Sequence, residues 1–247
     1  MNKTDILVIG GGPAGVVSAV TAKKHYPSKQ VTLIRKEEKG VIPCGIPYIF
    51  NRLTSADDNI MPDKSLEAND INLVINEVTQ VDPAKKEVSL KNEEAYSYDK
   101  LILALGSGPQ LIPIEGIEKE GVWLVKKDYN YLKDLREAVL KSKKVAIIGG
   151  GFIGVEFAEE LSSLENLDQV SVIEMLDHCL VSNFDPEFAE AAEEKLKKKG
   201  VQVHACQKVK SITGDGKAEG VELESGKTIE ADLVILSIGA QLNTDLL

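Results

Sequence analysis

Cysteine is scarce in this sequence, with only Cys44, Cys179 and Cys206 among 247 residues. These three form neither a CxxC pair nor a disulfide framework, which excludes a disulfide-stapled secreted scaffold. No apolar run is long enough to span a bilayer. The first five residues lead directly into a strand pattern, so we expect no signal peptide. We therefore expect a cytoplasmic protein without a membrane partner, in which a lone cysteine is either inert or chemically employed.

Positive charge is also in short supply. The sequence has 29 lysine and arginine residues against 39 aspartate and glutamate residues, for a net charge of −10. An acidic chain without a basic cluster argues against nucleic acid and anionic membrane surfaces as partners. Hydrophobic residues make up 43% of the chain and charged residues 28%. This composition is typical of a soluble globular protein, and the length allows one or two domains.

What the sequence does contain is an internal duplication. An apolar run at residues 5–10 leads into a glycine-rich turn, then small and apolar residues at helical spacing, then a second apolar run at residues 31–34. The same order recurs from residue 143 onward, with Gly149 following Gly10 by 139 residues (149 − 10) and no gap through the second run. Each copy predicts a strand, a turn, a helix and a strand. A repeat of this length is not a local coincidence.

Both turns carry the pattern GxGxxG. Its glycines are Gly10, Gly12 and Gly15 in the first copy and Gly149, Gly151 and Gly154 in the second. The first glycine makes the tight turn, the second lets the backbone approach a pyrophosphate, and the third lets helix and strand pack closely. The helix N-terminus then offers unpaired N–H groups to the phosphates. One such pattern can be an ordinary glycine-rich turn, but two in the same context predict two dinucleotide sites.

The end of the second strand in such a unit normally carries an acidic residue for the ribose hydroxyls. The second copy has Glu174 there, and its carboxylate would repel a 2′-phosphate, which favours NADH over NADPH. The first copy has Arg35 at the equivalent position. Arg35 is either a ligand contact or a solvated strand end, and Glu37 or Glu38 could take the place of the missing carboxylate.

The remaining segments fit around these two units. Residues 71–75 and 86–91 predict strands inserted after the first unit, and residues 99–105 and 233–238 predict buried strands. Residues 186–199 predict an amphipathic helix, and residues 201–231 predict a small β-meander. The fold class is therefore α/β, with two Rossmann-like dinucleotide-binding domains and an inserted β-meander.

Cys44 stands in an unusual context, between Pro43 and Gly45 and shortly before Pro47. If a helix starts at this point, its dipole would favour the thiolate and lower the pKa of Cys44. The alternative is a buried structural cysteine. Cys179 and Cys206 have no such context, and we expect both to be structural.

These features together resemble the pyridine nucleotide–disulfide oxidoreductase family, and in particular its single-cysteine branch of coenzyme A-disulfide reductases, NADH oxidases and NADH peroxidases. The resemblance covers essentially the whole chain. It rests on both glycine patterns, on the segment from Cys44 to Tyr48, on the segment from Asp99 to Gly106, and on Glu174. The classical members carry Cys-x4-Cys, and here the second position is Ile49, so the single-cysteine branch is indicated.

The resemblance implies that FAD binds the first unit and NADH, rather than NADPH, the second. The implied domains are residues 1–112 for FAD, residues 113–238 for NAD(P), and residues 239–247 as the return to the first domain. Besides Cys44, the implied FAD contacts are Gly10, Gly12, Pro13, Ala14, Gly15, Arg35, Ala104, Gly106 and Lys126. The implied NADH contacts are Gly149, Gly151, Ile153, Gly154, Glu156, Glu174 and Gly239.

The implied activity is an FAD-dependent oxidoreductase that passes electrons from NAD(P)H through the flavin to Cys44, and from there to a thiol-linked acceptor such as coenzyme A disulfide or a persulfide. The alternatives are an NADH oxidase that reduces oxygen, and a truncated module that binds nucleotide without turnover. The resemblance implies no metal and a homodimer in the full-length form.

Several positions depart from the family pattern. Pro13 stands where oxygen- and peroxide-reducing members have His, and Pro43 stands where coenzyme A-disulfide reductases have Asn. Leu105 and Leu242 replace a Thr and a Pro of two further motifs. Members also continue with a Gly-Asp segment that completes the FAD site and with a dimerisation domain. We therefore expect this chain by itself to retain FAD weakly and to turn over little.

Overall fold

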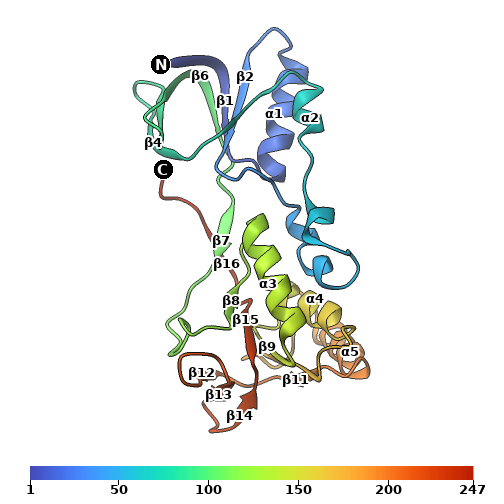
Figure 1. The fold of residues 1–247 in the computed structure, drawn as a ribbon. Helices are drawn as coiled ribbons and strands as arrows, with labels where there is room; N and C mark the ends of the chain where they lie inside the picture. Colours follow the sequence, from blue (N-terminus) through green and yellow to red (C-terminus); the bar gives the residue numbers. More distant parts are fainter. Residues whose placement is uncertain (247) are drawn as a thin grey trace. The chain divides into compact units, whose positions relative to one another are not determined.

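A computed structural model describes residues 1–246, and their contacts divide the chain into two compact units. Unit 1 contains residues 1–43, residues 60–108 and the chain from Leu242 onward, and unit 2 contains residues 44–59 and 109–241. Figure 1 shows the helices and strands of both units. Each unit has its own sheet and its own buried core, as the duplicated sequence predicts.

The units differ from the expected domain boundaries mainly at residues 44–59. We expected this segment to belong with residues 1–112, but its contacts place it in unit 2. The reason is a set of nonlocal contacts that strand and helix patterns do not encode: the ring of Phe50 packs against Phe157, and Arg52 forms an ion pair with Glu160.

Unit 1 is built on a six-stranded sheet with the order β3-β2-β1-β6-β5-β4. Its strands are β1 (Asn2–Ile9), β2 (Val31–Arg35), β3 (Asn72–Ile75), β4 (Val78–Asp82), β5 (Glu87–Leu90) and β6 (Ala95–Leu103). The first four in the sheet are parallel, and β5 and β4 continue it as an antiparallel hairpin. The strand predicted at residues 71–75 is present as β3, but it is not an insertion, because it pairs with β2 and completes the parallel sheet.

Both faces of this sheet are covered. The helices α1 (Pro13–His25) and α2 (Lys64–Glu67) pack on one face, where Ile6 and Val8 of β1 contact the core residues of the helices. The alternate residues Leu7 and Ile9 lie in a second cluster with side chains of the antiparallel strands. A strand buried on both faces needs a continuous apolar run, which explains the composition of residues 6–9.

Unit 2 is built on a five-stranded parallel sheet with the order β11-β10-β9-β15-β8. Its strands are β8 (Val122–Leu124), β9 (Lys144–Ile148), β10 (Gln169–Ile173), β11 (Gln202–His204) and β15 (Leu233–Leu236). The helices of the unit are α3 (Tyr129–Lys141), α4 (Phe152–Leu161) and α5 (Pro186–Lys198). The helix predicted at residues 186–199 is confirmed; it follows Asp185, starts with a proline and ends before Gly200, whose φ is 86°.

An antiparallel sheet covers one face of the unit 2 sheet, in the order β12-β13-β14. Its strands are β12 (Val209–Thr213), β13 (Gly220–Leu223) and β14 (Thr228–Glu230). This is the predicted β-meander. Two further strands, β7 (Ser107–Pro109) and β16 (Ala240–Leu242), form a two-stranded sheet, and the boundary between the units runs through them.

The duplication extends to strand register. In unit 1, Ile9 pairs with Ile34, and in unit 2 the residues 139 positions later, Ile148 and Ile173, pair in the same way. The strand order β3-β2-β1-β6 of unit 1 has its counterpart in β11-β10-β9-β15 of unit 2. In an open parallel sheet of this kind, ligands bind outside the carboxyl ends of the strands, where both glycine turns lie.

Candidate functional site

The first glycine turn follows β1 in unit 1. Gly10 has a φ of 115°, which favours glycine, and a Cβ at this position would overlap the carbonyl oxygen of Ala104. A Cβ on Gly15 would overlap the carbonyl oxygen of Gly10. A Cβ on Gly12, in contrast, would have no atom within 4 Å, so the backbone there faces open space. The turn is therefore closed toward the protein and open at the position where a pyrophosphate would approach.

The N-terminus of α1 adds a second feature that suits an anion. Gly12 is the residue before the helix and Pro13 and Ala14 begin it, so no side chain caps the first N–H groups. The first turn also contains no acidic residue. Free N–H groups and the positive end of the helix dipole are thus available to a phosphate.

The second glycine turn follows β9 in unit 2 and repeats these features. Gly149 has a φ of 104°, and a Cβ there would lie 2.6 Å from the carbonyl oxygen of Ser237. A Cβ on Gly154 would overlap the carbonyl oxygen of Gly149, whereas Gly151 faces open space. No side chain caps α4, which begins just after Gly151, and Ile153 in its first turn is exposed. The residues of both turns therefore fit a dinucleotide.

Glu174 lies directly after β10, at the rim of the second turn. Its Oε2 accepts a hydrogen bond from the N–H of Gly150 at 2.6 Å, and its Oε1 accepts one from the N–H of Leu176 at 2.8 Å. A carboxylate has about four acceptor sites, so this arrangement fixes the side chain and leaves capacity for ribose hydroxyls. The position predicted for Glu174 from the sequence is the position it occupies.

Arg35 lies at the equivalent place in unit 1 but has a different environment. Its side chain is buried and forms a two-pronged ion pair with Asp63, at 2.6 and 2.8 Å. It also donates to the carbonyl oxygens of Glu37 and Glu38, at 2.9 and 2.7 Å. Four of its five N–H groups are thus used within the protein. The guanidinium holds the loop after β2 in place, which the sequence interpretation as a solvated strand end missed.

The other expected cofactor contacts divide between the two units. In unit 1, Ala104 donates its N–H to Ile9 at 2.8 Å beside the first glycine turn, and Gly106 follows with a φ of 68°. In unit 2, Gly239 has a φ of 124° and accepts a hydrogen bond from the N–H of Gln110 at 3.0 Å. Lys126 also belongs to unit 2, and its ammonium lies over the ring of Tyr131, 4.6 Å from the centroid.

Glu156 occupies the second turn of α4 and is half-buried. Burial raises the pKa of its carboxyl, and the neighbouring charge of Glu159 raises it further. Because the pKa is raised in the folded state, protonated Glu156 contributes stability to the fold at pH values below the unfolded pKa. This stability is lost as the pH rises through the folded pKa. The side chain is consequently one that can take up a proton more readily than an exposed glutamate.

Cys44 lies in the short 3-10 helix η1 (Pro43–Gly45), and its side chain is exposed. The helix dipole considered for Cys44 is absent, because η1 has only three residues and the next element, η2 (Pro47–Phe50), is another short 3-10 helix. The turn is shaped by the close approach of Gly45 to the buried side chain of Asn59, which lies in η3 (Ala56–Asn59). A Cβ on Gly45 would overlap the side-chain oxygen of Asn59. The thiol is thus presented to solvent from a packed turn.

Cys179 should not react in the folded protein. It is fully buried, and burial together with the charges of Glu193 and Glu174 raises the pKa of its thiol to about 12. A thiol reagent at pH 8 should therefore modify the exposed Cys44 and Cys206 in the native state and Cys179 only after unfolding. Mass spectrometry of native and denatured samples measures this, and rapid native labelling of Cys179 would contradict it.

Sequence interpretation missed three residues that shape the site. Asn59 supports the turn of Cys44, Asp63 neutralises Arg35, and Arg52 pairs with α4. Each acts on a partner that is distant in sequence, so no local pattern marks it. Among residues 1–246, no group of three or more His, Cys, Asp or Glu side chains is arranged to hold a metal ion.

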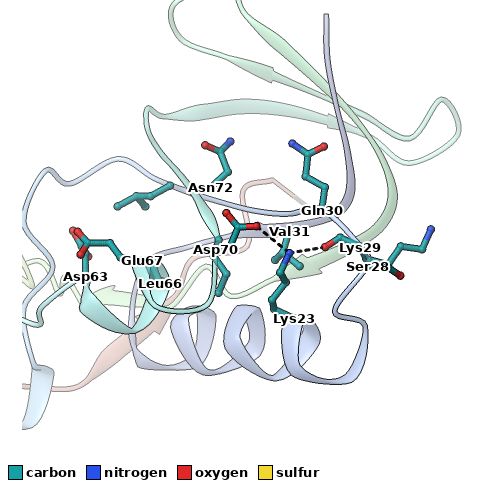
Figure 2. Close-up of a pocket in the computed structure, with 12 residues that line it drawn as sticks. Lys23, Ser28, Lys29, Gln30, Val31, Asp63, Leu66, Glu67, Asp70 and Asn72 are labelled. Atoms are coloured by element: carbon teal, nitrogen blue, oxygen red, sulfur yellow. Dashed lines mark hydrogen bonds and ion pairs between the residues drawn. The ribbon is translucent and has the colours of Figure 1, made fainter.

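A cavity of about 720 Å³ lies elsewhere in unit 1 (Figure 2). It is bounded by the C-terminal part of α1, by α2, and by the N-terminal ends of β2 and β3, which contribute Val31 and Asn72. The glycine turn lies at the opposite ends of these parallel strands. Lys23, which lines the cavity, donates hydrogen bonds from Nζ to Asp70 at 3.4 Å and to the carbonyl oxygen of Lys29 at 3.2 Å. This cavity is separate from the dinucleotide site.

Comparison with known proteins agrees with the dinucleotide-binding geometry of the two turns. Residues 4–247 match the family described as pyridine nucleotide-disulphide oxidoreductase. An NADH oxidase from Methanocaldococcus jannaschii is 34% identical over 256 residues, which cover 97% of this chain and 55% of that protein. An NAD(P)H coenzyme A polysulfide/persulfide reductase from Pyrococcus horikoshii is 34% identical, with 99% of this chain and 55% of that protein covered.

This chain belongs to the pyridine nucleotide-disulphide oxidoreductase family. The resemblance inferred from the sequence is thereby confirmed, as are the α/β fold with Rossmann-type sheets, the membership in an enzyme family, and FAD and NADH as the cofactors of that family. The chain spans about half the length of the curated relatives it matches.

Similar solved structures agree with the fold. A water-forming NADH oxidase from Lactobacillus brevis, bound to NADH, has a TM-score of 0.87 at 27% identity and covers 98% of this chain and 55% of its own. An NAD-dependent persulfide reductase from A. fulgidus has a TM-score of 0.85 at 28% identity, with 98% and 47% covered. Within the part of the chain that the structure describes, no helix is both long and apolar enough to cross a membrane.

Proposed function

We propose that this chain supplies the FAD-binding unit, the NADH-binding unit and the redox cysteine of an enzyme that passes electrons from NADH to a thiol-linked acceptor of the coenzyme A disulfide or persulfide type. The observation that carries the proposal is the exposed thiol of Cys44 in a chain with two open glycine turns. The persulfide reductases among its relatives support the acceptor class. We propose that the enzyme is a cytoplasmic homodimer.

The residues that would hold the cofactors are those of the two turns. Gly10, Gly12 and Gly15 would hold the pyrophosphate of FAD in unit 1, where a Cβ on Gly12 would have no atom within 4 Å. The turn around Gly151 would hold that of NADH in unit 2, and Glu174 would accept hydrogen bonds from its ribose. Bound flavin would supply the two-electron chemistry that links hydride transfer from NADH to sulfur reduction.

Cys44 would act on the acceptor as a nucleophile. Its thiolate would attack one sulfur of a disulfide RS–SR, forming a Cys44–S–S–R mixed disulfide and releasing the other half as RS⁻. The two electrons from NADH would then cleave the mixed disulfide, releasing the second RS⁻ and restoring the Cys44 thiolate. The exposed position of Cys44 lets a bulky acceptor reach its sulfur.

Oxygen reduction is the second candidate, favoured by the relatives that are named NADH oxidases. In that case two electrons from NADH and two protons would first reduce oxygen to peroxide, and the Cys44 thiolate would attack the peroxide to give a sulfenic acid and release hydroxide. Two further electrons and two protons would return the sulfenic acid to the thiol with release of water. The two candidates are separated by their acceptor: a disulfide yields two thiols per NADH oxidised, whereas oxygen yields none.

The first test is a visible absorption spectrum of the protein reconstituted with FAD, recorded before and after anaerobic addition of NADH. Flavin bands that bleach with NADH and leave a long-wavelength thiolate-to-flavin band would support FAD, the NADH site and Cys44 together. Protein that takes up no FAD, or flavin bands that NADH leaves unchanged, would overturn the proposal for this chain.

The charge of Glu174 should set the choice between NADH and NADPH. Glu174→Gln keeps the size of the side chain and one oxygen that can accept from Gly150, but it removes the repulsion of a 2′-phosphate. We expect the ratio of NADPH to NADH dissociation constants to fall by roughly tenfold. Fluorescence titration with both coenzymes measures the ratio, and an unchanged ratio would show that another residue discriminates.

A further inference from the structure

The segment that carries Cys44 is held by unit 2, although the chain on both sides of it belongs to unit 1. Residues 44–59 lie between Pro43 and Ile60, which are both unit 1 residues. Within unit 2, η2 packs against α4, the helix that begins at the second glycine turn. Contacts with the rest of unit 2 must therefore hold residues 44–59 in place.

The apolar part of the attachment is a pair of buried phenylalanines. Phe50 of η2 and Phe157 of α4 are 2% and 0% exposed, and their ring centroids lie 5.1 Å apart. Beside them, Arg136 of α3 donates from Nε to the carbonyl oxygen of Ile49 at 2.8 Å. These contacts bury η2, and the hydrogen bond from Arg136 holds its backbone.

The polar part is an ion pair with a buried carboxylate. Arg52 Nε lies 2.7 Å from Oε1 of Glu160, whose side chain is 1% exposed. The second oxygen, Oε2, is buried and has no hydrogen-bond partner. Arg52 also lies over the ring of Tyr48, 5.0 Å from its centroid, and within 3.5 Å of Glu159 on the solvent side. The side chain of Arg52 itself is 54% exposed, but its removal would leave the buried carboxylate without its cationic partner, which is costly.

We propose that Arg52 is a positioning residue for Cys44: through its ion pair with Glu160 it locks residues 44–59 onto α4, so that the cysteine turn keeps one defined place. This inference rests on the proposed function for its relevance to turnover, but the lock itself is a property of the folded chain. The pair acts eight residues from Cys44 and touches neither the thiol nor a cofactor turn.

The test measures local amide hydrogen exchange at residues 45–53 and the alkylation rate of Cys44, the latter in a Cys206→Ser background so that one exposed thiol remains. Arg52→Met keeps the aliphatic stem and removes the charge. We expect exchange at residues 45–53 to speed up at least tenfold and alkylation of Cys44 at least threefold, while exchange in β9 and β10 stays unchanged. Arg52→Lys, which keeps a cation, should restore both toward the native values.

Lys199→Met is the matched control. Lys199 follows α5 and pairs with Glu159 of α4 at 3.0 Å, so this variant removes a cation that contacts the same helix without touching Glu160. It should leave residues 45–53 unchanged. If Arg52→Met alone fails to fold because Glu160 is left unpaired, the double variant Arg52→Met/Glu160→Gln removes both charges and should fold with the same faster local exchange.

Native exchange and alkylation in a folded Arg52→Met or double variant would overturn the lock, as would equal effects of Lys199→Met. These readouts need no turnover, so they separate the two proposals. If local exchange is faster in Arg52→Met but Cys44→Ser still reduces disulfides, the ion-pair lock is supported and the proposed role of Cys44 is overturned. If exchange in Arg52→Met is native and Cys44→Ser is inactive, the lock is overturned and the proposed role of Cys44 is supported.

Discussion

Cys44→Ser is expected to abolish the proposed NADH-dependent reduction of a disulfide acceptor while leaving the fold intact. The side chain is exposed, so the change removes no buried packing. A serine hydroxyl cannot form a mixed disulfide, and loss of the proposed nucleophile should lower the turnover rate by roughly a thousandfold or more. The measurement is NADH oxidation with coenzyme A disulfide as acceptor, with thiol release followed in parallel.

Cys206→Ser is the matched control, because Cys206 is also exposed and lies in the same unit. It should retain the activity of the native protein. Slow oxygen consumption by bound flavin should persist in both variants, since it needs no thiol. Undiminished disulfide reduction by Cys44→Ser would show that the electrons reach the acceptor by another route.

Gly15→Ala and Gly154→Ala are expected to destabilise the unit that contains each of them. In both, the new Cβ would overlap a backbone carbonyl oxygen, that of Gly10 in unit 1 and that of Gly149 in unit 2. Backbone atoms at a tight turn cannot move aside as a flexible side chain would. We expect a loss of about 1–3 kcal/mol in the free energy of unfolding for each variant, as for other overpacked sites. Urea denaturation followed by circular dichroism measures it.

Gly12→Ala and Gly151→Ala separate folding from binding. Their φ angles are −74° and −72°, and no atom lies within 4 Å of a Cβ at either position. Both variants should fold with native stability. Because the Cβ would occupy the space that a pyrophosphate needs, the first should weaken FAD binding and the second NADH binding. Stability losses in these variants equal to those of Gly15→Ala would refute the division of roles.

The sequence by itself determined the two dinucleotide units. Apolar runs that end in GxGxxG specify a strand, a tight turn and a helix through local sterics, and the offset of 139 residues carries over into the strand register. Glu174 was predictable for the same reason, since the end of β10 has a fixed place relative to the turn. The exposed Cys44 was also marked by its local context of glycine and prolines.

Only the tertiary structure decided how the remaining residues are used. Arg35 stands where a carboxylate was expected, and its role was visible only once Asp63, 28 residues later, was brought against it. Residues 71–75 became a strand of the parallel sheet instead of an insertion, because β2 had a free edge to pair with. Residues 44–59 belong to unit 2 because Phe50 packs against the buried ring of Phe157 on α4 and Arg52 pairs with the buried carboxylate of Glu160 on the same helix. Strand and turn patterns reflect forces between near neighbours, whereas these pairings depend on which distant surfaces the completed sheets bring together.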